Sequence, residues 1–100
     1  MHTSRITVVH DHPAFAGHFP GDPLLPGVAL LAEVLEAALD QPELAALIGE
    51  SPRVGVVKFL APVRPGAVLT VLLDPGPRGL RFEVREGERL AASGQFEAAA

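Results

Sequence analysis

The spacing of hydrophobic residues changes along the chain and predicts the order of its elements. Residues 4–10, SRITVVH, form a short β-branched run that is typical of a strand. Residues 27–40, GVALLAEVLEAALD, predict a helix, because Leu, Ala and Glu dominate the segment and Pro26 stands where a helix can begin. Only Glu33 and Glu36 interrupt its apolar surface before the C-terminal end, so we expect this helix to be buried on most sides.

The C-terminal half is predicted to be a meander of strands that follows a short helical turn and linker. The clearest strand signal is LRFEVRE, in which apolar and charged residues alternate with a period of two. Proline and glycine separate the first three strands, and Glu86–Gly87 is expected to form a tight hairpin turn. The helical turn and linker cover residues 41–52, and the strands cover residues 53–60, 67–74, 79–86 and 89–98.

The order strand, long loop, helix and strand meander predicts an α+β fold. A helix that lies in the curve of an antiparallel sheet buries the apolar faces of both elements, so we expect the sheet to wrap round one central helix. The length predicts a single domain that covers residues 1–100. An exposed edge strand would pair with its copy across a two-fold axis and make the sheet continuous in a dimer.

The composition also favours an oligomer. Hydrophobic residues make up 48% of the chain and charged residues only 20%. A chain of this size buries only about 60–68% of its unfolded surface, so a lone domain would not easily hide so many apolar side chains. We therefore expect a homo-oligomer, most simply a two-fold dimer.

Charge and residue usage exclude several classes of function. The net charge of −4 argues against a nucleic-acid partner, since phosphate binding requires a basic surplus. The chain contains no cysteine, which excludes disulfides and thiolate chemistry. No basic and then apolar leader opens the chain, and no apolar run approaches the ~20 residues of a membrane span. We expect a cytoplasmic protein without a membrane span.

The connection between the first strand and the helix is unusually long. It covers residues 11–27, DHPAFAGHFPGDPLLPG, and contains four prolines. A loop of this length inside a compact domain is usually functional, and proline stiffens it because the ring fixes φ. His18 lies within this loop and is a candidate base, because histidine titrates near neutrality.

Two segments carry a resemblance to a known family. Residues 17–28, GHFPGDPLLPGV, resemble the signature of the hot-dog-fold 3-hydroxyacyl-[acyl carrier protein] dehydratases, approximately His-Phe-Pro-Gly-x-Pro-x-x-Pro-Gly-Val. Residues 58–69, KFLAPVRPGAVL, are similar to the stretch of that family in which a strand ends at a Pro-Gly turn. The resemblance implies a hot-dog fold. The signature positions that match are His18, Phe19, Pro20, Gly21, Pro23, Pro26, Gly27 and Val28.

The resemblance implies dehydration of a 3-hydroxyacyl thioester to the trans-2-enoyl form. His18, presented by Pro20, would take a proton from C2. The N–H groups of Gly27 and Val28 at the start of the helix would stabilise the charge that develops on the thioester oxygen. Phe19 and the apolar helix face would line a slot for the acyl chain.

The acid of this reaction is the point at which the sequence departs from the family. The family carries Glu or Asp on the helix, fourteen residues after the histidine, and this acid serves the site of the partner subunit. Ala32 stands at that position here. Ala32 has no acidic group, so we expect it to line the substrate site. Glu33 lies about 100° round the helix from Ala32, whereas Glu36 lies on the same face about 6 Å further along. Three interpretations remain open. Glu36 acts as the acid from a deeper position, Glu33 reaches the site from a helix that is rotated or begins one residue late, or the chain has no acid.

The third interpretation would make the protein a non-catalytic subunit that binds acyl chains or acyl carrier protein and supports an active dehydratase. A heterodimer with a paralogous dehydratase is therefore the alternative to a homodimer. In either case the resemblance implies acyl carrier protein as the partner, in fatty-acid-like or polyene biosynthesis. The phosphopantetheine arm would carry the substrate, and no other cofactor is expected. Lys58 and Arg64 are the candidate contacts for this acidic partner.

Two further possibilities are disfavoured. Hot-dog thioesterases typically use a helix carboxylate and a water, so they need no loop histidine. His10 and His12 form an H-x-H pair, but no third residue has the spacing of a metal ligand, and no metal site is expected. We expect His12 to anchor the loop through hydrogen bonds.

Overall fold

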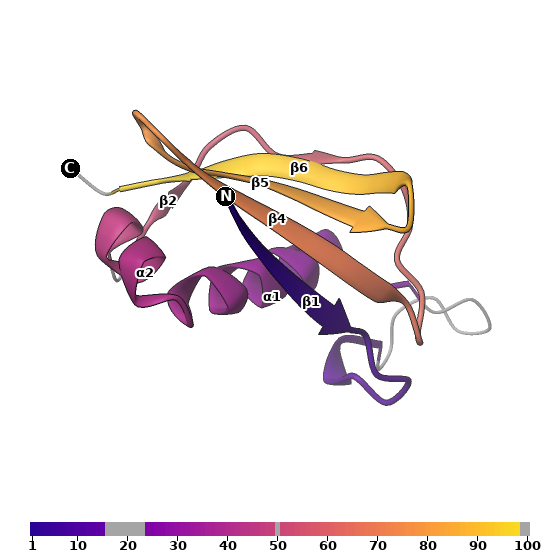
Figure 1. The fold of residues 1–100 in the computed structure, drawn as a ribbon. Helices are drawn as coiled ribbons and strands as arrows, with labels where there is room; N and C mark the ends of the chain where they lie inside the picture. The colour runs from indigo at the N-terminus through magenta and orange to yellow at the C-terminus, as the bar shows by residue number, and fades with distance from the viewer. Residues whose placement is uncertain (16–23, 50, 99–100) are drawn as a thin grey trace.

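The computed structural model describes residues 1–15, 24–49 and 51–98. One strand, a 3-10 turn and two helices make up the N-terminal half, and the remaining strands complete the chain (Figure 1). The elements are β1 (His2–Thr7), the 3-10 turn η1 (Pro13–Phe15), α1 (Gly27–Leu39), α2 (Pro42–Ile48), β2 (Arg53–Val54), β3 (Lys58–Phe59), β4 (Val68–Gly76), β5 (Gly79–Glu86) and β6 (Arg89–Glu97).

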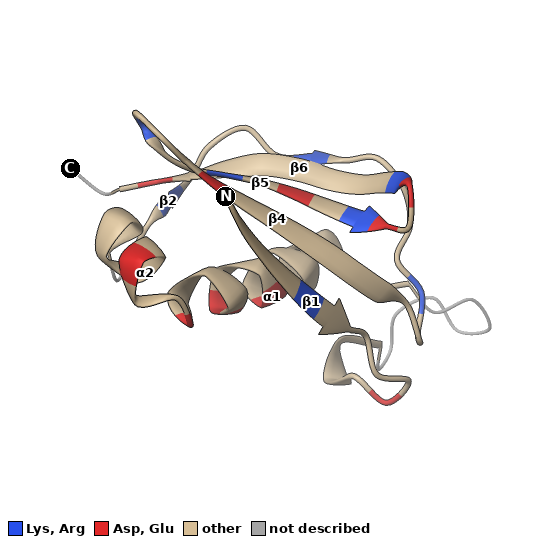
Figure 2. Ribbon diagram, viewed as in Figure 1, with Lys and Arg blue, Asp and Glu red and all other residues tan. Residues whose placement is uncertain are grey.

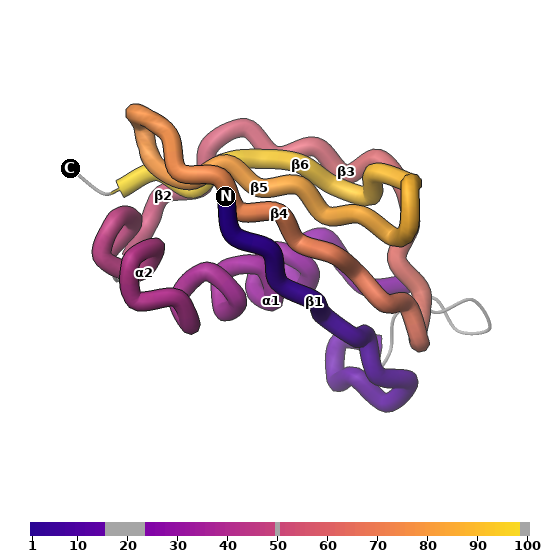
Figure 3. Tube along the Cα trace, in the orientation of Figure 1, coloured from indigo at the N-terminus to yellow at the C-terminus, as the bar shows by residue number. Residues whose placement is uncertain are grey.

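All six strands belong to one antiparallel sheet. The strand order is β1-β4-β5-β6-β2, and β3 also pairs with β6. The N-terminal strand β1 therefore lies at one edge, while the short strands β2 and β3 lie beside β6 at the other (Figure 3). Both helices cover the same face of the sheet (Figure 1). This arrangement confirms the predicted α+β architecture. None of the described helices has the length and apolar character needed to cross a membrane.

The core lies between α1 and the sheet and follows the predicted alternation. In β5, Leu80, Phe82 and Val84 are buried, while Arg81 between them is exposed. The Phe82 ring stacks on Phe96 of β6, with ring centroids 5.1 Å apart. The predicted hairpin turn is also confirmed, since β5 ends at Glu86, β6 begins at Arg89 and Gly87 has a φ of 61°.

The predicted strand 53–60 is interrupted in the structure. Arg53 pairs with Glu97 in β2, whereas Lys58 pairs with Ser93 in β3, so this edge contains one more residue than the facing part of β6. An extra residue on one strand breaks the ladder and bends the edge. The prediction of one continuous strand was therefore wrong, because an apolar run does not reveal where an edge strand bulges.

The expectation that α1 is buried on most sides also fails within the single chain. Leu30, Val34, Ala37 and Ala38 are buried. The opposite face is exposed, and the Val28 residue on it is 80% exposed. A sheet contacts only one side of a helix that lies across it, so covering the other side would require further protein.

Candidate functional site

The N-terminus of α1 supplies hydrogen-bond donors. The helix begins at Gly27 after an extended Pro26, and among the described residues no side chain caps it. Leu30 donates its N–H to the carbonyl of Pro26, which starts the helical ladder. The N–H groups that precede Leu30 have no acceptor within the helix and carry the positive end of its dipole. They can therefore stabilise negative charge on a bound oxygen.

An apolar groove with a volume of about 560 Å³ lies against this terminus. One wall is the start of α1 with the residues before it, and the other is the segment from Phe59 to Val63. The two walls are joined by a 2.8 Å hydrogen bond from the N–H of Leu25 to the carbonyl of Val63. The groove is lined by Leu24, Leu25, Pro26, Gly27, Val28, Leu30, Phe59, Leu60, Ala61, Pro62 and Val63.

Phe59 lies directly over Gly27. A Cβ atom on Gly27 would stand 2.7 Å from Cζ of the Phe59 ring, so the contact depends on glycine at this position. The ring is 51% exposed and forms part of the groove wall. Sequence reasoning did not single out Phe59, although the similarity of residues 58–69 to the dehydratase family covers it. Gly27 and Val28 both line the groove, and their role toward a substrate stays a prediction.

The predicted base falls outside the described part of the chain. His18, Phe19 and Pro20 belong to residues 16–23, which the structure does not describe. Their roles stay predictions. The described residues that flank this segment in the chain are Phe15 and Leu24.

The two candidate acids lie on different sides of α1. Glu36 is exposed on the outward face, together with Val28 and Ala32, one turn apart from each other along the helix. Glu33 is 30% exposed on the flank of the helix, where its Oε1 lies 2.8 Å from Nε2 of His12. Glu36 is therefore open to solvent within the described part of this single chain.

The predicted anchoring role of His12 is confirmed. Besides its contact with Glu33, its Nδ1 accepts a 3.0 Å hydrogen bond from the N–H of Ala14. The side chain is 20% exposed, and its ring meets Phe15 edge-on, with centroids 6.0 Å apart. The loop is thus attached to α1 before the undescribed residues begin.

Charge is distributed unevenly over the elements. The helices α1 and α2 carry acidic residues but no Lys or Arg, whereas basic residues lie on strands and loops (Figure 2). Lys58 and Arg64 are both exposed and stand immediately before and after the groove wall 59–63. Positive charge therefore flanks one wall of the groove, as an acidic partner would require.

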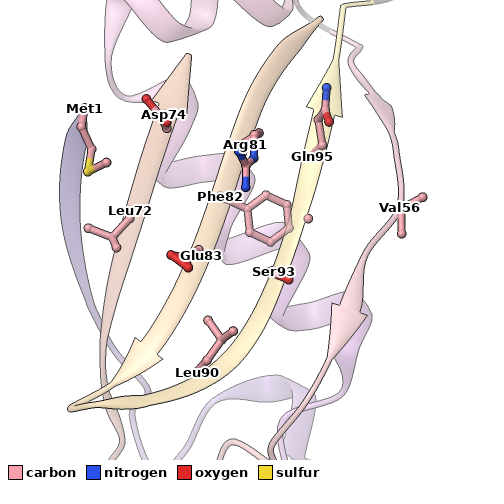
Figure 4. A pocket seen from close by; sticks show the side chains of 11 residues that line it. Met1, Val56, Leu72, Asp74, Arg81, Phe82, Glu83, Leu90, Ser93 and Gln95 are labelled. Atoms are coloured by element: carbon pink, nitrogen blue, oxygen red, sulfur yellow. The ribbon is translucent and has the colours of Figure 1, made fainter. Parts of the chain in front are cut away.

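A second hollow, of about 350 Å³, lies on the face of the sheet away from the helices (Figure 4). Its polar side chains stand on β4, β5 and β6, where Asp74 is the cross-strand partner of Arg81, and Arg81 of Gln95. These residues are neighbours in the strand register and lie on the far side of the sheet from the α1 terminus. We therefore take the groove at α1 as the candidate site.

Comparisons with known proteins identify the family to which the chain is similar. The model of a family described as ApeI-like, ApeI dehydratase, matches residues 1–95. A 3-hydroxyacyl-[acyl-carrier-protein] dehydratase FabZ of Chlamydia trachomatis is 41% identical over 73 residues, which cover 64% of this chain and 46% of that protein. The chain thus spans about half the length of this curated relative.

Solved structures extend the likeness to nearly the whole chain. The dehydratase heterocomplex ApeI:P from Xenorhabdus doucetiae gives a TM-score of 0.76 at 26% identity, covering 95% of this chain and 83% of that one. An uncharacterized protein from Erwinia carotovora gives a TM-score of 0.75 at 35% identity, covering 95% and 79%. These matches confirm the predicted hot-dog fold.

Proposed function

The chain belongs to the ApeI-like dehydratase family, and we propose that it dehydrates 3-hydroxyacyl thioesters carried on acyl carrier protein to their trans-2-enoyl forms. The observation that carries the proposal is the uncapped N-terminus of α1, which opens onto an apolar groove. The groove suits an acyl chain, and the helix N–H groups suit the oxygen of a thioester enolate.

In the proposed reaction His18 removes a proton from C2 of the substrate. The electron pair of the C–H bond moves toward the thioester carbonyl, whose oxygen is stabilised by the N–H groups of Gly27 and Val28. The pair then forms the C2–C3 double bond while the C3 hydroxyl accepts a proton from an acid and leaves as water. The substrate arrives on the phosphopantetheine arm, and no other cofactor takes part.

We assign the acid to Glu36 of a second subunit. Glu36 lies on the same exposed helix face as Ala32 and Val28, whereas Glu33 is engaged by His12 within its own chain. Exposed apolar side chains are found both on α1 and on the sheet edge that contains β2 and β3, as expected of surfaces that another subunit covers. They are Val28, Leu39, Val54, Val56, Phe59 and Leu60. The simplest partner is a second copy of the chain.

A second candidate function is that of a non-catalytic subunit in a heterodimer with a paralogous dehydratase. The observation that favours it is Ala32, which is exposed where the family carries its acid. The similar structure from Xenorhabdus doucetiae is described as a heterocomplex. In this arrangement the chain would bind the acyl chain or the carrier protein, while the paralogue supplied both the base and the acid.

Acyl carrier protein is the proposed macromolecular partner in both cases. Lys58 and Arg64 flank the groove wall and would meet its acidic surface, which would direct the phosphopantetheine arm toward α1.

One assay separates the two functions. The purified chain is incubated with a 3-hydroxyacyl-[acyl carrier protein], alone and with a paralogous dehydratase, and enoyl product is measured by mass spectrometry. Turnover by the chain alone, abolished by His18→Ala with an unchanged melting temperature, is expected of the enzyme. Turnover only in the mixture, insensitive to His18→Ala in this chain, would support the non-catalytic subunit. Undiminished turnover by His18→Ala alone would remove His18 from the mechanism.

A further inference from the structure

Both ring nitrogens of His12 are engaged by groups on different parts of the chain. The N–H of Ala14 donates to Nδ1 over 3.0 Å, so Nδ1 is the acceptor nitrogen of a neutral ring. Nε2 then carries the proton and donates it to Oε1 of Glu33 over 2.8 Å. The N–H of Ala14 therefore determines the tautomer of His12. With the proton on Nε2, Glu33 is the acceptor of the second hydrogen bond.

This geometry limits what each side chain can do in the proposed chemistry. His12 has no free nitrogen with which to take a proton from a substrate. Oε1 of Glu33 accepts from His12, so only Oε2 is left for a second partner. The pair is therefore suited to holding two segments together rather than to transferring a proton.

The His12–Glu33 pair joins the beginning of the long loop to α1. His12 and Glu33 are 21 residues apart in the chain, so their contact links the turn η1 to the second turn of α1. Phe15 closes this turn, since its N–H donates to the carbonyl of His12 over 3.0 Å and its ring contacts the His12 ring. In the sequence only residues 16 and 17 separate Phe15 from His18.

We propose that His12 and Glu33 are a positioning pair, whose hydrogen bond holds turn η1, which precedes His18 in the sequence, against α1. The kinetic part of this inference rests on the proposed dehydratase function, whereas the structural part does not. Glu33 acts as a hydrogen-bond acceptor in this role and not as the acid of the reaction.

The substitutions Glu33→Gln and Glu33→Ala separate these roles. The amide oxygen of glutamine still accepts from Nε2–H of His12 but glutamine cannot serve as an acid, so Glu33→Gln should retain a kcat of the wild-type order of magnitude. Glu33→Ala and His12→Ala should each lower kcat by about 10- to 100-fold, because small displacements of reacting groups carry losses of this size. The double variant should lose no more than either single variant, since both remove one interaction.

Two measurements test the pair without reference to turnover. Nitrogen NMR of His12 should show a protonated Nε2 and an unprotonated Nδ1, and hydrogen exchange of the Ala14 and Phe15 amides should accelerate in both alanine variants but not in Glu33→Gln. His2→Ala is the matched control, because His2 forms a comparable 3.4 Å pair with Glu43 at the other end of β1. It should leave both kcat and these amides unchanged.

The outcomes separate failure of the inference from failure of the proposed function. A Glu33→Gln variant as inactive as Glu33→Ala would overturn the inference and make Glu33 the acid. Unchanged amide exchange in His12→Ala, or a proton on Nδ1, would overturn it even if the enzyme is active. Wild-type protein without turnover, but with the expected tautomer and exchange, would refute the dehydratase function while sustaining the pair as a loop anchor.

Discussion

The close contact between Gly27 and Phe59 leads to a prediction about the candidate site. In Gly27→Ala the new Cβ would stand 2.7 Å from Cζ of Phe59, and ordinary contacts begin at 3.4 Å, so the ring must retreat by about 0.7 Å. Half of the ring is exposed, so it can move by leaving its preferred rotamer at a cost of about 0.5–1.5 kcal/mol. Replacing glycine by alanine in a helix stabilises by up to about 1 kcal/mol.

The two effects oppose each other, so the free energy of unfolding of Gly27→Ala should differ from wild type by no more than about 1.5 kcal/mol. For a domain of this size, each 1 kcal/mol corresponds to a change in melting temperature of about 4–8 °C. The groove wall nevertheless moves at the point where the thioester is proposed to bind. We expect kcat/KM to fall on the order of tenfold, because displacements of this size disturb a bound reaction geometry.

Phe59→Ala provides the matched background for this test. Without the ring there is no clash, so Gly27→Ala should have little further effect on kcat/KM in that background, and the two substitutions should be strongly non-additive. Thermal unfolding and steady-state kinetics on the four proteins measure both quantities. An equal loss of kcat/KM in the two backgrounds would refute the reasoning, because it would show that the Phe59 ring is not the obstacle.

Three further experiments test the fold, the acid and the partner. Gly79→Ala should lower the free energy of unfolding, measured in urea, by about 2–4 kcal/mol, because Gly79 has a φ of 146° and a Cβ atom there would meet the backbone of β6. Gly76→Ala is the control, since a Cβ atom at Gly76 would have nothing within 4 Å. Equal stability of the two variants would contradict the predicted strain at Gly79. Glu36→Gln should abolish turnover without changing the melting temperature; an unaltered kcat would place the acid elsewhere. Charge reversal of Lys58 and Arg64 should raise KM for substrate on acyl carrier protein but not for a small thioester analogue, and equal effects on both would exclude a carrier-protein contact.

Local patterns in the sequence predict much of this fold. The alternation in residues 80–85 reports that one face of a strand is buried, and β5 has that face against the core. The helix from Gly27 to Leu39 follows from its composition and the preceding proline. The interruption between β2 and β3 has no such signal, because a bulge depends on the register against β6 rather than on the apolar run itself.

The candidate site divides in the same way. The Pro-Gly segment that leads into α1 places Gly27 and Val28 at a helix terminus, and this placement could be predicted because helix starts carry local signals. The ring of Phe59 above Gly27 could not, since 32 positions separate the two residues in the chain.

The sequence by itself determined the α+β order of elements, the helix that begins at Gly27 and the family signature around His18, because each depends on neighbouring residues. Only the tertiary structure decided that Phe59 closes over the helix terminus and that Glu33 accepts from His12. Those contacts join residues far apart in the chain, and their geometry arises when the sheet and the loop are packed against α1, a step for which no short stretch of sequence carries a signal.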